Sequence, residues 1–572
     1  MRTMLKPLLI LLYLAGSLGV IGERLVSLGL SPSLLVYVGL FGLLAACLLL
    51  AAQVGNHALR GAYALILAAA AAYLESYERI TSGHLTYDAF INLWNSSEFA
   101  DEAARQHLAT IAWATLAPLL LLVGVALKPR PIPRLPRAAL AVAPVAGVAL
   151  LAAILFVRGG DGARGLPSAF TPLAYSAIYA YEAATGAAGP REAITLPRRG
   201  APVERDIVLI VDESVGGNYL DLNSASGVRS GLAEPREGLA IHNYGYAAAI
   251  TNCSVGTNVT LRHGGTRSDY QRINVTMPSI WDYARRAGLR TIYIDAQRTG
   301  GILHNLMTPE ERAAIDRFIQ FDHVPVRGRD MAAADQIAAL VNDATPQFIL
   351  VNKVGAHFPV HDKYPDVFMR YRPVLARGGH EAVSDTGDRD GFGGAGPDWL
   401  RYRNSYRNTL LWNVGAFFDR LFAQAGLANA TLIYTSDHGQ DLHERGDPGL
   451  NTHCGSDPVI EEGLVPLVVV EGGKPALDWR RNLAANHDRV SHYAIFPTLL
   501  ALMGYDEARA RPVYGDTLVA RSTDDFTFNT RFNARLGMKP SWRFIDLDEI
   551  VTPPPEVQSA HADVPRPATK GR

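Results

Sequence analysis

Five long apolar runs in the first 157 residues limit the fold of this 572-residue chain more than any other feature. The runs span residues 7–22, 33–53, 60–75, 108–127 and 137–157. Each approaches the roughly 20 residues that a helix needs to cross the hydrocarbon core of a bilayer. A single such run also occurs in soluble cores, but five in series predict a transmembrane domain of five helices over residues 1–157.

The first run has an alternative interpretation as a cleaved signal peptide, because Arg2 and Lys6 flank it. The sequence Gly22-Glu23-Arg24 is a poor cleavage site, however, and four further apolar runs follow. We therefore interpret residues 7–22 as an uncleaved helix.

The loop at residues 128–137 predicts the orientation of this domain. It carries Lys128, Arg130, Arg134 and Arg137 and no acidic residue. Short loops rich in lysine and arginine stay on the cytoplasmic side. The N-terminus is then also cytoplasmic, and everything after the fifth run is extracytoplasmic.

After residue 157 the composition changes. Residues 158–204 read as a linker, in which 172–184 is either a helix along the membrane surface or a plain connecting helix. Residues 205–520 alternate β-type runs with helical stretches, which predicts an α/β domain with a mainly parallel sheet. Residues 521–572 form a C-terminal extension with a Pro-rich, disordered end, and 374–398 reads as an excursion loop. The strand candidates are 206–211, 290–294, 347–351, 431–435 and 464–470.

Acids and histidines follow three of these strand candidates. They are Glu213 after 206–211, His357 after 347–351, and Asp437 and His438 after 431–435, with His453 in the next loop. Ligands in such sheets bind beyond the carboxyl ends of the strands. Carboxylate oxygen and imidazole nitrogen are ligands of Zn²⁺. The joint occurrence of these residues predicts a metal site.

A nucleophile is expected near such a metal. The segment 251–262 offers the hydroxyls of Ser254, Thr257 and Thr260 and the thiol of Cys253. Metal coordination activates a hydroxyl that is otherwise a poor nucleophile. The formal net charge of −1 excludes a nucleic-acid binder that works by bulk charge, so no nucleic-acid partner is expected.

Together these motifs resemble those of the alkaline phosphatase and sulfatase superfamily, and more narrowly the membrane-bound phosphoethanolamine transferases that modify lipid A. The resemblance covers about residues 7–520. Glu213 matches the family's G-E-T/S motif and Asp437-His438 its S-D-H-G motif. Gly355-Ala356-His357-Phe358-Pro359 matches the G-S-H-G-P motif, and His453 matches a late histidine.

The resemblance also implies roles for these residues. The family's nucleophilic threonine stands four residues after a cysteine, with a hydroxyl residue three further on, a spacing that Cys253, Thr257 and Thr260 reproduce. Thr257 is therefore the implied nucleophile, with His357 and His453 as catalytic residues. The implied metal ligands are Glu213, Thr257, Asp437 and His438, which would hold one or two Zn²⁺ or another divalent ion.

The implied reaction is transfer of a phosphoethanolamine-type group from a phospholipid donor to a lipid or glycan acceptor of the envelope, through a phospho-threonine. The implied location is the bacterial inner membrane, with the catalytic domain in the periplasm. A lysine that the family has in the substrate loop is absent, and Gln297 and Arg298 stand there instead; with Lys353 they are the expected substrate-binding residues.

Three alternatives remain. Phosphoglycerol transferases share the same scaffold and metal set and are the main one. A sulfuric ester hydrolase is less favoured, because Cys253-Ser254-Val255-Gly256-Thr257 lacks the proline and arginine of the C/S-x-P-x-R motif. A non-catalytic membrane module is disfavoured by intact candidates at every metal position.

The chain has three cysteines, which excludes zinc ribbons of paired cysteines and disulfide-dense folds. Two of them lie near predicted site residues: Cys253 stands four residues before Thr257, and Cys454 directly follows His453. They either form one disulfide, as an oxidising compartment favours, or remain two buried thiols.

Overall fold

The structure is a computed structural model. It describes residues 5–29, 31–81, 83–95, 97, 100, 104, 107–129, 136–185, 190–199, 202–343, 345–377, 396–446, 450–455 and 457–553. Arg130 and Arg134 of the basic loop, most of the predicted excursion loop 374–398 and most of the tail 551–572 lie outside these residues.

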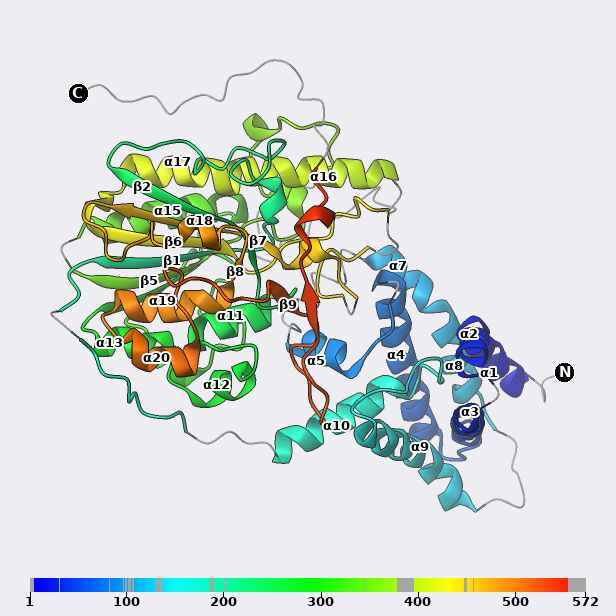
Figure 1. The fold of residues 1–572 in the computed structure, drawn as a ribbon. Coiled ribbons are helices and arrows are strands. Elements are labelled where there is room, and N and C mark those ends of the chain that lie inside the picture. Colours follow the sequence, from blue (N-terminus) through cyan, green and yellow to red (C-terminus); the bar gives the residue numbers. More distant parts are fainter. Residues whose placement is uncertain are drawn as a thin grey trace.

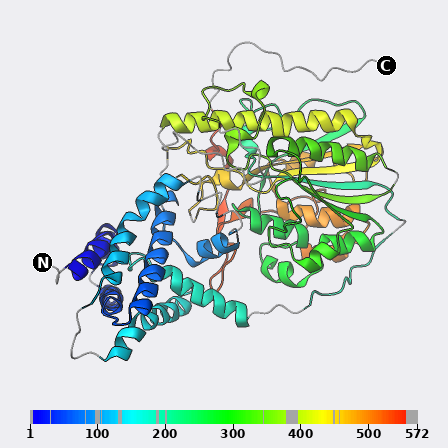
Figure 2. The ribbon, with the colours of Figure 1, turned by 180° about the vertical axis from the view of Figure 1, so that it is seen from behind.

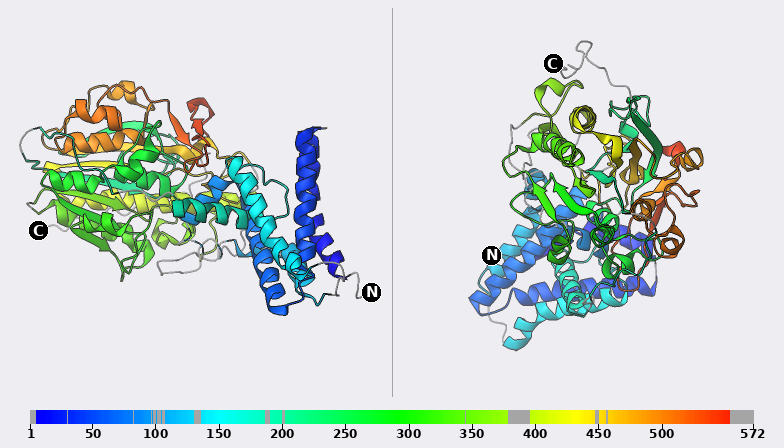
Figure 3. Two further views of the ribbon diagram at one scale, coloured as in Figure 1. Left: turned by 90° about the horizontal axis from the view of Figure 1, so that it is seen from below. Right: turned by 90° about the vertical axis from the view of Figure 1, so that its left-hand side faces the viewer.

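The N-terminal part is a group of apolar helices at one end of the molecule (Figures 1 and 3). Its helices are α1 (Leu5–Ala15), α2 (Leu18–Leu28), α3 (Pro32–Ala51), α4 (His57–Thr81), α5 (Tyr87–Asn95), α7 (Leu108–Ala114), α8 (Leu116–Ala126), α9 (Arg137–Val157) and α10 (Thr171–Thr185). Within the described residues, α3, α4 and α9 are long and apolar enough to cross a membrane. The bent pairs α1–α2 and α7–α8 raise the number of candidate spans to five if each pair is one span.

Both bends have a local cause in the sequence. The first bend, of 51°, falls at Gly16-Ser17, inside the predicted run 7–22. The second, of 42°, falls at Thr115. Pro118 follows it, and a proline ring clashes with the carbonyl four residues before it, here that of Ala114. Each pair is therefore two helices joined at a bend, where the sequence predicts one continuous helix.

Helix α10 covers the sequence for which a surface helix or a connector was expected. It packs on α4, α5 and α9, and Tyr175 from its buried face donates a hydrogen bond to the carbonyl of Gly160 at 3.0 Å. The helix is therefore part of the N-terminal helix group.

The C-terminal part is an α/β domain built on one eight-stranded sheet (Figures 1 and 2). Its strand order is β4-β3-β5-β1-β6-β7-β2-β8. The strands are β1 (Asp206–Asp212), β2 (Leu239–Ala248), β3 (Arg290–Asp295), β4 (Arg317–Gln320), β5 (Gln347–Asn352), β6 (Ala430–Ser436), β7 (Leu464–Gly472) and β8 (Val490–Ser491). From β4 to β6 the strands are parallel, and β7 is antiparallel to both of its neighbours.

Helices cover both faces of this sheet, as expected for buried parallel strands. On one face lie α15 (Val326–Val341), α16 (Gly396–Leu410) and α17 (Phe417–Gln424), seen above the sheet in Figure 1. On the other lie α11 (Ser254–His263), α13 (Ile280–Arg286), α19 (Ile495–Leu502) and α20 (Glu507–Tyr514). Smaller helices are α12 (Tyr270–Thr276), α14 (Pro309–Ala313) and α18 (Leu483–Asn486).

The C-terminal extension forms a two-stranded ribbon of β9 (Thr527–Asn529) and β10 (Trp542–Phe544). It runs between the sheet domain and the apolar helices in Figure 1. The N–H of Asn529 donates to the carbonyl of Ile250 at 2.9 Å, and Asn533 Nδ2 donates to Asn92 Oδ1 of α5 at 2.5 Å. This segment therefore joins the two parts of the chain.

Candidate active site

The register of two central strands brings the predicted ligands together. Strands β1 and β6 pair in parallel, with Asp212 opposite Ser436. Glu213 and Asp437 are the next residues, and they leave the sheet side by side. The N–H of Asp437 donates to the carbonyl of Asp212 at 2.8 Å, which continues the pairing one step beyond the strands.

Glu213, Asp437 and His438 form a compact buried cluster. Their ligand atoms all lie within 4.8 Å of one another. His438 Nε2 lies 3.3 Å from Glu213 Oε1 and 3.7 Å from Asp437 Oδ2. The other ring nitrogen of His438 lies 2.7 Å from the carbonyl oxygen of Gly439, to which it donates, so Nε2 is directed to the carboxylates.

The electrostatics of the cluster are those of a cation site. Burial alone would raise the pKa of Glu213, but the hydrogen bond and charge of His438, and the charge of His357, hold it well below its ordinary value. Burial raises the pKa of Asp437 well above its usual range, and the nearby charge of Glu213 adds to this. Burial would lower the pKa of His438, yet the charge of Asp437 and the hydrogen bond to Glu213 raise it to about 9. Without a cation the cluster thus retains protons, which a bound metal would displace.

The donor set fits a divalent metal ion. Asp437 Oδ1 accepts hydrogen bonds from the N–H groups of Ser214 and His438, whereas the buried Oδ2 has no hydrogen-bond partner among the described residues. Carboxylate oxygen and imidazole nitrogen are ligands of Zn²⁺, and three protein ligands leave a fourth position open at a catalytic site. These three predicted ligands are therefore brought together.

Ser254 is the hydroxyl residue that reaches this cluster. Its Oγ donates to Glu213 Oε1 at 3.1 Å and lies 3.1 Å from His438 Nε2. Ser254 is the first residue of α11, directly after Cys253. The fourth position around the cluster is therefore occupied by a serine hydroxyl.

Thr257, the residue expected as nucleophile and fourth ligand, lies elsewhere. Its Oγ1 donates to the carbonyl of Thr251 at 3.3 Å and is 3.4 Å from the N–H of the same residue. Thr257 thus supports the loop that precedes α11 and does not hydrogen-bond to Glu213 or His438. Of these hydroxyls, the one that contacts Glu213 and His438 is that of Ser254, the first residue of α11.

The two other predicted catalytic residues lie beside the cluster. The ring of His453 stacks on that of His438, with 4.4 Å between their centroids. Burial lowers the pKa of His453 well below its usual range, and the charge of His438 lowers it further, so this ring is neutral at pH 7. His357 Nδ1 lies 2.7 Å from the carbonyl oxygen of Phe358, and the charge of His357 reaches Glu213.

The three expected substrate-binding residues differ in position. Gln297 Nε2 donates to Glu213 Oε2 at 3.1 Å and to the carbonyl of Lys353 at 2.8 Å, so it borders the cluster. Arg298 is buried next to it in the chain, and its N–H donates to Asp295 Oδ1 at 3.3 Å.

Lys353 does not face a substrate. It is 0% exposed, and its Nζ donates to Asp212 Oδ2 at 2.7 Å. The same ammonium lies 4.0 Å from the ring centre of Phe417. Lys353 therefore stabilises the sheet edge behind Glu213, and the structure does not support the substrate contact expected of it.

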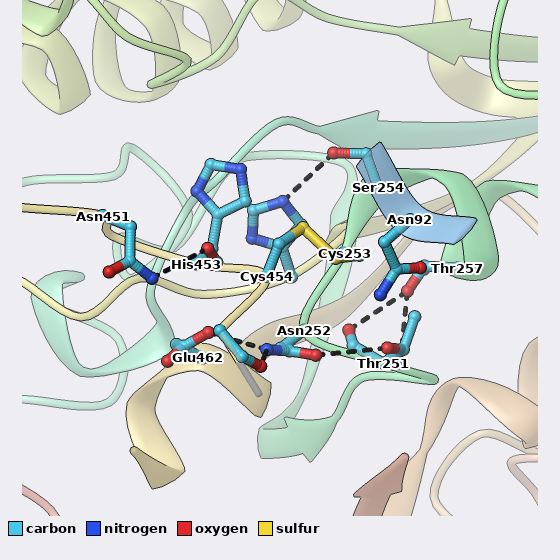
Figure 4. The surroundings of a disulfide bond; sticks show 12 residues. Asn92, Thr251, Asn252, Cys253, Ser254, Thr257, Asn451, His453, Cys454 and Glu462 are labelled. Carbon is cyan, nitrogen blue, oxygen red and sulfur yellow. Dashed lines mark hydrogen bonds between the residues drawn. A yellow bond between two sulfur atoms is a disulfide. The ribbon is translucent and has the colours of Figure 1, made fainter. Parts of the chain in front are cut away.

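A disulfide joins the serine loop to the histidine loop. Cys253 and Cys454 are bonded, with their Cα atoms 5.0 Å apart and a sequence separation of 201 (Figure 4). The N–H of Cys454 also donates to the carbonyl of Asn252 at 3.0 Å. Of the two alternatives from the sequence, the bonded pair is thus the one found, and it fixes Ser254 relative to His453.

Two residues beside this disulfide were not expected from the sequence. Asn252 Nδ2 donates to Glu462 Oε2 at 2.8 Å and to the carbonyl of Gly455 at 3.1 Å. Burial raises the pKa of Glu462 to about 8. Nothing in their spacing indicates this contact, because they are far apart in the sequence and only the fold brings them together.

Comparisons with known proteins agree with this architecture. The integral membrane protein lipooligosaccharide phosphoethanolamine transferase A (EptA) from Neisseria meningitidis matches over 88% of this chain and 96% of its own, with 18% identity and a TM-score of 0.60. The C-terminal periplasmic domain of EcEptC from Escherichia coli, solved in complex with Zn, matches over 63% of this chain and 97% of its own, with 17% identity and a TM-score of 0.46. Among curated proteins, none is similar enough in sequence to count as a match.

The first of these matches covers both the apolar helices and the α/β domain, so the whole fold is shared with a membrane protein. The Sulfatase family model matches residues 205–505, which is more than half of the chain and includes every residue of the cluster. On the combined strength of this match, the fold and the Glu213–Asp437–His438 cluster, the chain belongs to the sulfatase family.

Proposed function

We propose that this protein transfers a phosphoethanolamine-type group from a phospholipid to a lipid or glycan of the envelope, in a metal-dependent reaction with a covalent phospho-serine. The observation that carries the proposal is the position of Ser254 Oγ, 3.1 Å from both Glu213 Oε1 and His438 Nε2. The whole-chain similarity to a phosphoethanolamine transferase supports the class of reaction.

Ser254 is well placed to attack phosphorus. It begins α11, and the first N–H groups of a helix have no partner within the helix. Such a helix end stabilises the negative charge of a phosphoryl group. The nucleophile and an anion-binding helix end therefore coincide.

The first half-reaction forms the bond between Ser254 Oγ and phosphorus and breaks the bond from phosphorus to the diacylglycerol oxygen. The hydroxyl proton moves toward Glu213, which already accepts the hydrogen bond from Oγ. The same proton ends on the departing diacylglycerol oxygen, so this half-reaction needs no second proton donor. Diacylglycerol leaves and phospho-Ser254 remains.

A divalent cation held by Glu213, Asp437 and His438 would supply the positive charge that lowers the pKa of the serine hydroxyl. Zn²⁺ suits the two carboxylates and the imidazole. Gln297 keeps Glu213 in place through its hydrogen bond to Oε2.

In the second half-reaction a hydroxyl or phosphate oxygen of the acceptor attacks phospho-Ser254. The new bond joins that oxygen to phosphorus, and the bond from phosphorus to Ser254 Oγ breaks, which returns the serine. His357 and His453 border the space beside the cluster and are the side chains we assign to the phosphoryl oxygens.

The proposed location is the inner membrane, with the α/β domain on the periplasmic side. The candidate spans and the disulfide support this, because disulfides persist in oxidising compartments such as the periplasm. A membrane anchor also brings the enzyme to a lipid donor.

Phosphoglycerol transfer on the same scaffold is the second candidate, because the cluster is equally suited to that donor. Sulfuric ester hydrolysis is less favoured, since the second and fourth residues after Ser254 are Gly256 and Asn258, where formylglycine maturation needs proline and arginine.

The test is an analysis of lipids and glycans from cells that express the wild-type chain or Ser254→Ala. We expect a product that carries phosphoethanolamine, together with diacylglycerol, only with the wild-type chain. A phosphoglycerol-modified product would select the second candidate, and identical profiles for both chains would refute transfer.

A further inference from the structure

A cavity of about 670 Å³ lies among the N-terminal helices, separate from the metal cluster. Segments from five places in the sequence line it: the α1–α2 junction, the end of α4, the following loop 83–86, Ala117 of α8, and the stretch from Arg158 to Tyr175. By the orientation predicted from the basic loop, the end of α4, the loop 83–86 and the stretch after Arg158 are extracytoplasmic, whereas the α1–α2 junction lies within the first predicted span.

The cavity carries charges of both signs. Glu75, Glu78 and Asp161 line it, as do Arg24, Arg79, Arg158 and Arg164, the last of which lies 2.6 Å from Glu23. Ser168 Oγ donates to Glu75 Oε1 at 2.9 Å, and His84 Nδ1 lies 3.1 Å from Glu78 Oε1. Acidic and basic groups around one cavity suit a ligand that bears both an ammonium and a phosphate.

One buried polar atom at the wall has no protein partner. Thr171 is 1% exposed and lines the cavity, yet its Oγ1 forms no hydrogen bond to any described residue. A buried hydroxyl without a partner costs free energy, and a phosphate oxygen would satisfy it.

The surroundings indicate an amphiphile. The cavity is also lined by apolar residues, among them Leu74, Leu85 and Leu166. Next to it, α2 exposes large apolar side chains, with Leu18 63% and Val26 86% exposed. Acyl chains would find apolar helix surface directly beside the charged wall.

The cavity also has a direct link to the active site. Helix α4 continues past Glu75 and Glu78 to Ile80, whose carbonyl accepts a hydrogen bond from the N–H of Leu450 at 2.8 Å. Three residues later in that segment stands His453. The wall of the cavity and the loop of a catalytic histidine are thus joined by one hydrogen bond.

We propose that this cavity binds the zwitterionic headgroup of a membrane phospholipid, with the ammonium at Glu75 and Glu78 and the phosphate at Arg24, Arg158 and Thr171. This rests on the proposed function in that the bound lipid is the donor, held next to the membrane before its phosphate reaches Ser254.

The test measures binding of phosphatidylethanolamine to the full chain with Ser254→Ala, so that no turnover occurs. Native mass spectrometry in detergent counts the retained lipid and gives its affinity. We expect one lipid per chain, about tenfold weaker binding in Glu75→Gln, and about fivefold weaker binding in Thr171→Val, as expected for the loss of one charged and one neutral hydrogen bond.

The matched controls are Ser176→Ala and Glu192→Gln. Ser176 is on the same helix as Thr171 and donates to the carbonyl of Pro172, and neither control residue lines the cavity. Both should bind lipid as the parent does. Thr171→Val removes only an unpartnered hydroxyl, so its fold should survive even if Glu75→Gln disturbs the helices.

Unchanged affinity in both Glu75→Gln and Thr171→Val would overturn the inference, whatever the transfer rate. Competition by soluble glycerophosphoethanolamine as strong as that of the lipid would overturn the assignment to a membrane lipid. If the variants bind lipid as expected but the wild-type chain transfers nothing, the inference stands and the proposed function fails.

Discussion

The hydroxyl oxygen of Ser254 lies 3.1 Å from Nε2 of His438, whereas Thr257 turns its hydroxyl to the backbone of Thr251. One turn of α11 thus separates a hydroxyl at the cluster from one that supports the loop. We expect Ser254→Ala to lower transfer by at least about 10³-fold, since loss of a nucleophile removes the covalent route.

Thr257→Ala should keep most of the activity and lose some thermal stability, because only a loop contact is removed. Mass spectrometry of the trapped enzyme should find the phosphoryl adduct on Ser254. An inactive Thr257→Ala protein beside an active Ser254→Ala protein would restore the assignment made from the sequence.

Removal of the metal is the second prediction. Asp437→Asn replaces the carboxylate whose Oδ2 lacks a partner, so it should lower the bound divalent metal well below one ion per chain and abolish transfer. Elemental analysis of the purified full chain measures this. Asp335→Asn, an exposed carboxylate paired with Arg420, is the control and should keep its metal. Equal metal content in both variants would place the ion elsewhere.

The third prediction concerns the disulfide. Because the bond closes a loop of about 200 residues, the chain-entropy model assigns it about 5 kcal/mol of stability as an upper value. We expect Cys253→Ser with Cys454→Ser to lower the unfolding temperature of the α/β part and to reduce transfer, through a looser Ser254. Cys47→Ala, which removes the remaining cysteine, is the control. Identical unfolding with and without the bond would contradict the prediction.

The fourth prediction is a pH dependence from Glu462. Its carboxyl is buried beside Asn252, and burial raises its pKa to about 8 from the ordinary 4.5. Between these values the folded chain holds a proton that the unfolded chain releases. The contribution of this carboxyl to the free energy of unfolding is therefore fully present below about pH 4.5. It is lost as the pH rises through 8, by up to about 1.4 kcal/mol per pH unit.

Glu462→Gln should remove this component, because glutamine is uncharged at every pH. Thermal unfolding of the full chain between pH 6 and 9 should fall more steeply for the wild-type chain than for the variant. Parallel curves would show that Glu462 is already ionised in the folded chain.

The fifth prediction concerns orientation. A reporter active only in the periplasm should be active when fused after residue 520 and silent when fused within 128–137, because basic loops remain cytoplasmic. The opposite pattern would place the α/β domain in the cytosol and would contradict the proposed periplasmic location of the transfer reaction.

Motifs that end apolar strands could be predicted from the sequence. β1, β5 and β6 are mainly apolar runs followed by polar residues, so the strands and the clustering of Glu213, Asp437 and His438 could both be predicted. Strand β2 could not be predicted from the sequence. Gly245 lies at an irregularity in its pairing with β7 and interrupts the run of strand-forming residues. β8 has only two residues and carries no pattern.

The hydroxyl that contacts this cluster could not be chosen in the same way. Ser254, Thr257 and Thr260 have similar chemistry, and only the start of α11 decides which of them reaches Glu213 and His438. The charged cavity could not be predicted from the sequence for a related reason. Its wall combines residues from distant segments, such as Arg24 and Arg158, which no local sequence pattern connects.

The hydrogen bond from Leu450 to Ile80 has a consequence for how this enzyme can be dissected. A soluble fragment that starts at residue 190 would lack the acceptor carbonyl, and Asn533 would lose its contact with Asn92. The loop that bears His453 would then be tethered at the disulfide end alone. Such a fragment would retain the predicted metal ligands, yet we expect it to react more slowly than the full chain. The difference in rate would show how far the membrane helices themselves help to shape the catalytic centre.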